Sequence, residues 1–321
     1  MRVQSSAALI TVGLCLQVFF AQAGKDSLAV KYGTSITAAD LNKHLKVLAS
    51  DEYEGRETGE KGQKMAAEYI ARFFESTGVA TPPKHSYFQE FPLHKQYSSG
   101  VSVTVDNTPY RFLNDFFFLR GFQDTVLKTN EVVFLGYGEQ DVQYSDYAGA
   151  PDITGKVVMF LAETPTDKKG NDLLKTPANS TDWVRCWRSK IPMAAEQGAA
   201  AVLVVLDKLP VIAKGIKHFL ESPVVRLDVP TKGQDSGTPA FFITRDMANA
   251  IMADSKWSVK KLVKKMRKSG QSQSVTVSTD LVLDVQRKQE KMVAENVLGY
   301  IPGTDLKDEL IVITAHYDHL G

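Results

Sequence analysis

Apolar residues recur along this 321-residue chain at two spacings, which predict two kinds of structural element. Between residues 37 and 78 they recur every three or four positions, as on one side of an amphipathic helix. One helix is predicted to begin at Thr37–Asp40, a sequence that resembles a capping box, and another to span about 63–77 and stop at Gly78. Their predicted buried sides consist of Leu41, Leu45, Leu48, Met65, Tyr69, Ile70, Phe73 and Phe74.

The middle of the chain has a different pattern, in which short apolar runs are separated by glycine and polar residues. Such runs predict strands, so this region is expected to be an α+β module rich in β-structure. A helix is predicted over 245–252. The predicted strands are 88–93, 101–105, 132–135, 156–161, 199–206 and 238–243.

Four further apolar segments follow towards the C-terminal end. Residues 274–278 and 281–285 alternate like a half-exposed strand pair. Residues 294–301 and 309–315 are predicted to be central strands joined through a turn at Pro302–Asp305. Together these segments predict that a sheet resumes after the β-rich module.

The first residues have the composition of a secretory signal peptide over 1–23. Arg2 precedes a short apolar stretch, and Ala21–Ala23 is a small-residue cleavage site. Cleavage would remove Cys15 and leave Cys186, which cannot form an internal disulfide. The protein is therefore predicted to be exported, either to a periplasm or to the exterior, with no stable membrane span after cleavage. The alternative interpretation is an N-terminal membrane anchor.

Overall charge argues against a nucleic-acid partner. The 38 Lys and Arg residues nearly balance the 37 Asp and Glu residues. One basic segment, Lys256–Lys268, has apolar residues at helical spacing and predicts a helix. Its lysines are expected to form a solvated face, and a surface for a membrane or an anionic partner is the alternative.

A His-x-Asp pair follows the last apolar run, with His316 and Asp318 placed after 309–315. Open α/β sheets bind their ligands outside the carboxyl ends of strands. A neutral imidazole is a good zinc ligand, and a nearby carboxylate can fix its tautomer and raise its basicity. The pair is therefore a candidate for part of a zinc site, and the alternative is a core or rim histidine with a polar neighbour.

Several blocks of sequence resemble secreted di-zinc aminopeptidases, which are related to glutamate carboxypeptidase and the transferrin receptor. Residues 49–62 and 66–71 resemble the opening of that family, and 295–303 and 311–321 resemble the strands that deliver its first zinc histidine. The middle of the chain resembles the protease-associated domain inserted in many members. Its marks are Gly136–Gly138, Asp146–Tyr147, Gly155–Val158, Ala194–Ala201 and Thr238–Phe241.

The resemblance implies an α/β fold with two parts. One is the mixed sheet and helices of a zinc exopeptidase, of the phosphorylase/hydrolase-like type and incomplete here, and the other is the inserted α+β, β-rich domain. Residues 24–105 would form the first part of the peptidase domain and 106–270 the inserted protease-associated domain. Residues 271–321 would continue the peptidase domain, truncated after the strand that carries the first zinc ligand.

The resemblance also implies a function. The chain would belong to a zinc-dependent exopeptidase that removes N-terminal residues from peptides with two zinc ions. His316 would bind one zinc, and Asp318 would orient a ligand and tune the metal pair; His319 has no assigned role. In the family the other ligands and the general base come later in the sequence. This chain is therefore expected to carry only the first half of the site and to be inactive alone.

Two other functions remain open. The inserted domain could serve protein interaction on a non-catalytic remnant, as in the receptor branch of the family. The chain could instead resemble glutaminyl cyclases, which share the fold but generally lack the insert. Among smaller features, Asn179–Thr181 is a glycosylation sequon, and Cys186 is interpreted as a packing residue and not as a nucleophile.

Overall fold

The computed structural model describes residues 27–118, 124–175, 182–228 and 237–320, and it divides the chain into two compact units. Unit 1 consists of Met1–Ala66 with Ile313–Gly321, and unit 2 of Ala67–Val312. The predicted signal peptide and the sequon lie outside the described residues. Within those residues, every helix is too short or too polar to cross a bilayer.

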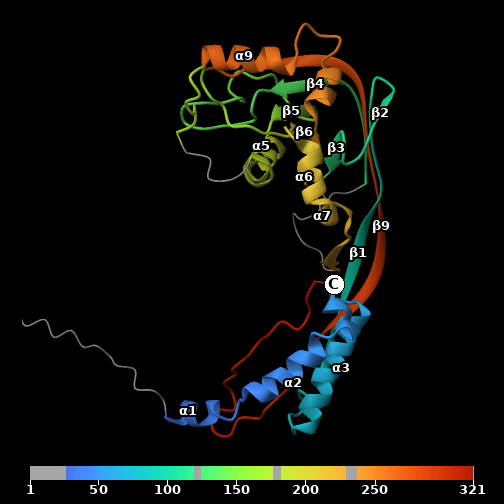
Figure 1. The fold of residues 1–321 in the computed structure, drawn as a ribbon, viewed down its shortest axis with the longest axis vertical. Helices are drawn as coiled ribbons and strands as arrows, with labels where there is room; N and C mark the ends of the chain where they lie inside the picture. The colour runs from blue at the N-terminus through green and yellow to red at the C-terminus, as the bar shows by residue number, and fades with distance from the viewer. Residues whose placement is uncertain (1–26, 119–123, 176–181, 229–236, 321) are drawn as a thin grey trace, which may run out of the picture. The chain divides into compact units, whose positions relative to one another are not determined.

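The described residues of unit 1 before 67 are mainly helical, whereas residues 313–320 form no helix or strand (Figure 1). The elements of unit 1 are α1 (Ser27–Gly33), α2 (Ala38–Leu48), the 3₁₀ turn η1 (Asp51–Arg56) and the beginning of α3 (Lys61–Ser76), followed much later in sequence by 313–320. The hydroxyl oxygen of Thr37 accepts a hydrogen bond from the backbone N–H of Asp40 and caps α2. The predicted start of α2 at Thr37 and both predicted helices are therefore confirmed.

The prediction of a buried side on α2 is wrong. Leu41 is 58% exposed and Leu45 is 64% exposed, although both lie on the side that their spacing predicted to be covered. A periodic apolar side is buried only when another element packs against it. Among the described residues, no element covers this side of α2.

Unit 2 contains a mixed sheet. In the described residues its strands have the order β2-β1-β9-β4-β5-β6-β8-β3, and β7 pairs with β1. The run β4-β5-β6-β8 is parallel and the other pairings are antiparallel. The strands are β1 (Phe88–Val105), β2 (Thr108–Tyr110), β3 (Phe116–Phe118), β4 (Thr125–Leu135), β5 (Val157–Leu161), β6 (Ala201–Val205), β7 (Val224–Leu227), β8 (Ala240–Ile243) and β9 (Ser274–Val297).

The core of unit 2 lies around the parallel strands. Every residue of β5, β6 and β8 is buried, as expected for parallel strands that are covered on both faces. The predicted strands 132–135, 156–161, 199–206 and 238–243 all correspond to observed strands, although their ends differ by a few residues. The remaining helical elements are α4 (Asp182–Arg185), the π-helical turn η2 (Cys186–Lys190), α5 (Ile191–Glu196), α6 (Leu209–Gly215), α7 (Lys217–Glu221), α8 (Arg245–Ile251) and α9 (Val259–Ser269).

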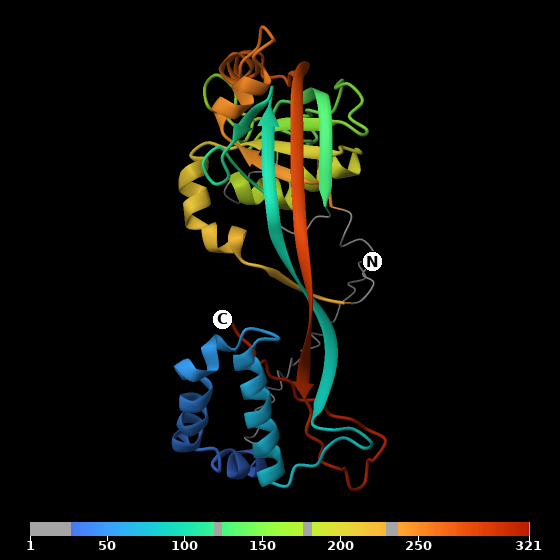
Figure 2. The ribbon, with the colours of Figure 1, turned by 90° about the vertical axis from the view of Figure 1, so that its right-hand side faces the viewer.

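The longest strands are β1 and β9, and the whole of β1 pairs with residues 281–297 of β9 (Figure 2). The prediction that 274–278 and 281–285 form a strand pair is wrong, because both lie within β9. Between Leu281 and Ser278 this strand advances three positions, while β4 advances two from Thr129 to Glu131. β9 therefore carries one extra residue in a β-bulge, which absorbs the polar interruption that suggested a turn.

Of the two predicted central strands near the C-terminal end, 294–301 forms only in part and 309–315 does not form. Residues 294–297 form the end of β9, and no helix or strand occurs from 298 to 320. Ile311 and Ile313 are 89% and 92% exposed. A strand forms only where a neighbour can take its N–H and C=O groups, and none of the described residues pairs with 309–315. The expectation that His316 ends a buried strand is wrong for the same reason.

Candidate metal centre

The His-x-Asp segment is held in unit 1 by the loop that follows α2. Glu54, Gly55 and Arg56 have φ values of 45°, 69° and 62°, so the backbone reverses sharply through three left-handed residues. The Arg56 guanidinium donates hydrogen bonds to the carbonyl oxygen of Leu48 and, over 2.9 Å, to that of Tyr317. The carbonyl oxygen of Arg56 accepts from the His319 N–H at 3.0 Å. Arg56 thus fixes the backbone on both sides of Asp318.

Two further side chains position the same segment. The Thr58 hydroxyl donates to Oδ2 of Asp318 over 2.7 Å. The Gln63 amide, which is buried at the beginning of α3, donates to the Tyr317 hydroxyl and accepts from the Gly59 N–H at 3.2 Å. The carboxylate of Asp318 is therefore oriented by a neutral donor, and the adjacent residue is anchored through both its backbone and its side chain.

Close packing of the loop on α3 supports this arrangement. A Cβ atom added to Gly62 would overlap the carbonyl oxygen of Tyr53 and lie 2.6 Å from its carbonyl carbon. Backbone atoms cannot rotate away as a side chain does, so only glycine allows α3 to begin this close to η1. Gly62 therefore sets the distance from which Gln63 reaches Tyr317.

His316 and Asp318 do not by themselves fit a complete zinc site. His316 is exposed and Asp318 is half-buried. Within the described ranges, no group of three or more His, Cys, Asp and Glu side chains is placed to hold a metal. Zinc sites usually have about four ligands, so this donor set of one imidazole and one carboxylate is insufficient. The metal roles of these two residues stay predictions.

The sequence interpretation assigned no chemistry to the 54–57 loop and did not identify Arg56, Thr58 or Gln63 as positioning residues. Their contacts to 317–319 join positions about 260 residues apart, and hydrogen bonds between such distant polar residues leave no periodic pattern. The available signal was the turn-rich composition of 51–62, which indicates a loop that needs unusual backbone angles.

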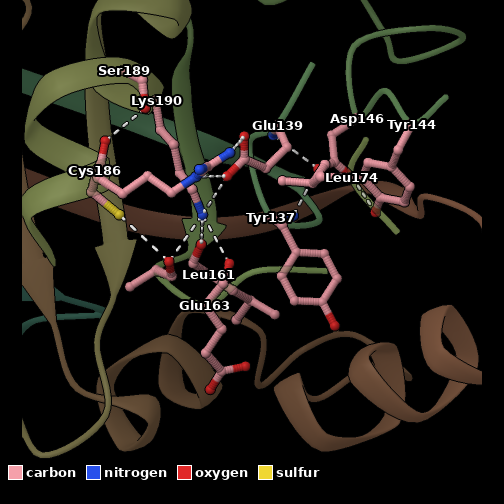
Figure 3. Close-up of polar contacts among 12 residues, drawn as sticks. Tyr137, Glu139, Tyr144, Asp146, Leu161, Glu163, Leu174, Cys186, Ser189 and Lys190 are labelled. Atoms are coloured by element: carbon pink, nitrogen blue, oxygen red, sulfur yellow. Dashed lines mark hydrogen bonds and ion pairs between the residues drawn. The ribbon is translucent and has the colours of Figure 1, made fainter. Parts of the chain in front are cut away.

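Unit 2 contains a separate buried polar cluster near the carboxyl end of β5 (Figure 3). Lys190 is completely buried, and its Nζ donates to the carbonyl oxygens of Leu161, Ala162 and Glu163 at 3.1, 2.9 and 2.8 Å. Nζ also lies 3.4 Å from Oε1 of Glu139. The carboxylate of Glu139 receives two hydrogen bonds from Arg185, at 2.6 and 3.0 Å. The buried charges are thus paired, which is the condition for their burial.

Asp146 forms the second half of this cluster. Its carboxylate accepts hydrogen bonds from the backbone N–H groups of Tyr137 and Glu139 at 3.0 Å each and from the Tyr144 hydroxyl at 2.9 Å. Burial raises the pKa of Asp146, while these donors act in the opposite direction. Gly136, at φ 53°, approaches Asp146 so closely that a Cβ would overlap its Oδ1. The sequence marks Gly136–Gly138 and Asp146 therefore belong to one packed network.

Cys186 lies beside this cluster. Its buried Sγ is 3.7 Å from the carbonyl oxygen of Ala162. A thiol that is completely buried cannot reach a substrate, because reactive cysteines lie in partially exposed sites. The interpretation of Cys186 as a packing residue agrees with this placement.

Four polar residues occupy equivalent places at the carboxyl ends of the parallel strands. Each is two positions beyond the last residue of its strand: Tyr137 after β4, Glu163 after β5, Asp207 after β6 and Arg245 after β8. Arg245 bridges the carboxylates of Glu163 and Asp207. Burial raises the pKa of Glu163, whereas the hydrogen bond from Arg245 lowers the pKa of Asp207. This arrangement joins the ends of three strands by ion pairs.

No family model and no curated protein matches the chain. Solved structures similar to it include an aminopeptidase from Aneurinibacillus sp. strain AM-1, at 16% identity and a TM-score of 0.40, covering 85% of this chain and 50% of that one. A zinc aminopeptidase from Bacillus subtilis is 14% identical with a TM-score of 0.36, over 87% and 51%. A peptidase M28 precursor from Shewanella amazonensis SB2B is 18% identical with a TM-score of 0.34, over 91% and 56%. The chain spans about half the length of these structures.

Proposed function

We propose that the chain carries part of the site of an exported zinc-dependent exopeptidase that removes N-terminal residues from peptides. In this proposal His316 binds one of two zinc ions and Asp318 orients a ligand. The observation that supports it best is the contact between two sequence blocks that resemble the same peptidase. The Thr58 hydroxyl donates to Asp318 across a separation of 260 residues, and Arg56 donates to the Tyr317 carbonyl across 261.

The contacts of Tyr317 and Asp318 agree with the roles proposed for His316 and Asp318. Thr58 uses one oxygen of Asp318, and the other oxygen would be left to hold an imidazole. Arg56 holds the backbone of Tyr317, which lies between the two candidate residues. When bound, a zinc pair would supply a water of lowered pKa and stabilise the oxyanion. Because two donors do not hold zinc tightly, we assign peptide hydrolysis to an assembly that supplies the remaining ligands.

The domain assignment belongs to the same proposal. Residues 24–105 and 271–321 would form the interrupted peptidase domain, and 106–270 the protease-associated insert. The contacts between the 56–63 region and 317–319 support a domain that is discontinuous in sequence. The exported location and the peptide substrate rest on the sequence alone.

Zinc titration followed by NMR of the histidine imidazoles tests the metal assignment. We expect the His316 resonances to shift at weak, supramicromolar zinc affinity, and the remaining imidazoles of His316→Ala to show no zinc-induced shift at the same zinc concentrations. Asp318→Asn should weaken the His316 shift, while the matched variant His319→Ala should leave it unchanged. Zinc-induced shifts at another histidine with the His316 resonances unmoved, or loss of the His316 shift in His319→Ala, would refute the assignment. Submicromolar binding that depends on His316 would instead show that the donor set is larger than we infer.

A non-catalytic interaction module remains the second candidate because unit 2, which contains residues 106–270, has an extensive buried core. Strands β5, β6 and β8 are buried at every position, and the cluster around Lys190 and Asp146 is internally paired. Zinc-dependent release of N-terminal residues from aminoacyl anilides, lost in His316→Ala, would exclude this function.

A further inference from the structure

Helix α9 presents an unusually basic surface within unit 2. Its apolar residues Val259, Leu262 and Met266 are buried against the core, and every basic residue of the helix is exposed. At 100° per residue the cations occupy roughly 160° of the helix circumference, opposite the buried stripe. With Lys256 before the helix, the basic face consists of Lys256, Lys260, Lys261, Lys264, Lys265, Arg267 and Lys268.

The charge of this face is local and does not reflect the whole chain. The segment 256–268 contains seven Lys and Arg residues and no Asp or Glu. Removing these seven from the 38 basic residues leaves 31 against 37 acidic ones, so the rest of the chain has a net charge of −6. The basic face therefore carries a charge of +7, whereas the other residues of the chain together carry a net negative charge.

The folded chain does not neutralise this charge. In the part of the chain that the structure describes, no basic residue of the face forms an ion pair with an acidic side chain. Lysines four residues apart on a helix repel one another, as Lys260, Lys264 and Lys268 do. Lys260 and Lys261 also lie in the first turn, where the helix dipole disfavours cations. Within the fold, Lys256 and Lys265 lie over the Trp257 ring, at 5.4 and 5.1 Å from its centroid. Arg267 and Lys268 lie in the last turn, where the helix dipole favours cations. These contacts leave the net positive charge of the face in place, and an anionic partner would compensate it.

The geometry of α9 favours a flat anionic partner. Both views place the helix at one end of unit 2 (Figures 1 and 2). Because its apolar stripe is already buried, the helix cannot insert its apolar side into a bilayer. Contact would be made by lysine side chains, which are long enough to reach a common plane. A bilayer need touch only this end of unit 2.

We propose that the basic face of α9 docks unit 2 onto the surface of an anionic lipid bilayer by electrostatic attraction alone. Each Lys near such a surface strengthens binding by a similar amount, so several lysines together give measurable association. The attraction must weaken with salt, because surface charges are screened within a Debye length. This inference is independent of the peptidase proposal and concerns a different unit of the chain.

Vesicle co-sedimentation of the full chain tests the proposal. We expect binding to vesicles of phosphatidylglycerol and phosphatidylcholine, but not to vesicles of phosphatidylcholine alone. Binding should be lost when NaCl rises from about 0.05 M to about 0.5 M. The variant K260Q/K264Q/K268Q should bind roughly 100-fold more weakly. K260R/K264R/K268R, which keeps the charge, should bind as the unchanged chain does.

The matched control is K168Q/K169Q/K214Q, which removes three exposed lysines elsewhere in unit 2. Equal loss of binding in this control would overturn the proposal, because net charge and not the α9 face would then decide binding. Salt-resistant binding, or binding to phosphatidylcholine alone, would also overturn it. So would binding to heparin or to double-stranded DNA without binding to anionic vesicles, since the partner would then be a linear polyanion.

Discussion

Lys190 offers the sharpest test of how unit 2 is held together. Its ammonium is completely buried and donates to three consecutive carbonyl oxygens, those of Leu161, Ala162 and Glu163. Lys190→Met removes the charge and keeps an unbranched chain that can still pack in the same space. The three carbonyls and the carboxylate of Glu139 then lose a donor that water cannot replace.

The expected destabilisation is about 3 kcal/mol. Removing one partner of a buried ion pair costs about 3–5 kcal/mol, because the other charge stays buried without compensation. Here the compensation is not lost entirely, since Arg185 still donates to both oxygens of Glu139 at 2.6 and 3.0 Å. The cost should therefore fall at the low end of that range.

Urea unfolding followed by tryptophan fluorescence measures this cost in unit 2, because the three tryptophans of the chain, at 183, 187 and 257, all belong to that unit. Lys156→Met is the matched control. Lys156 pairs with Glu131 at 2.7 Å, but the two side chains are 34% and 38% exposed, so its loss should cost at most about 1 kcal/mol. A Lys190→Met effect no larger than that of Lys156→Met would refute the account.

Three other substitutions follow from the packing. The buried Tyr147 hydroxyl has no hydrogen-bond partner among the described residues, and burial raises its pKa, so it keeps its proton in the folded state when the unfolded chain loses it. Stability should therefore fall as pH rises past about 10, and Tyr147→Phe should remove about 1.4 kcal/mol per pH unit of that slope in urea titrations without loss at pH 7. Gly138→Ala places a Cβ 2.7 Å from the buried Phe160 ring at φ 65° and should cost about 2–4 kcal/mol in the same assay, whereas Gly149→Ala meets no atom within 4 Å at φ 77° and should cost only the backbone strain of about 1–2 kcal/mol. Gly62→Ala should cost about 1–3 kcal/mol and speed amide hydrogen exchange over 51–66, while Gly33→Ala, with open space around it, should not.

The sequence predicted those parts of the fold whose pattern is local and strong. The core strands β5, β6 and β8 are continuous apolar runs, and such runs are buried wherever they lie in the sheet. The basic helix was predicted because its apolar residues recur at helical spacing, and α9 buries three of them. In both cases the residues that bury the element are supplied within unit 2.

Predictions failed where the outcome depends on a neighbour that the pattern does not reveal. The break at Thr279–Asp280 has the composition of a turn, but β4 pairs with β9 on both sides of it and holds β9 extended through a bulge. Leu41 and Leu45 have the spacing of a buried side, yet none of the described elements covers them. Apolar periodicity indicates which residues can be buried. Whether they are buried depends on another element packing against them.

At the candidate site, the apolar pattern and the polar contacts lead to different structures. The run 309–315 has strand composition but no strand, whereas the residues just after it are fixed by polar contacts from Arg56, Thr58 and Gln63. Because these contacts reach Tyr317 and Asp318 without any strand pairing, the orientation of Asp318 does not depend on a completed sheet. A partner strand along 309–315 would add backbone hydrogen bonds before His316 and would leave the contact between Thr58 and Asp318 in place. The loop that received no chemical role from its sequence is therefore the element that positions the candidate carboxylate.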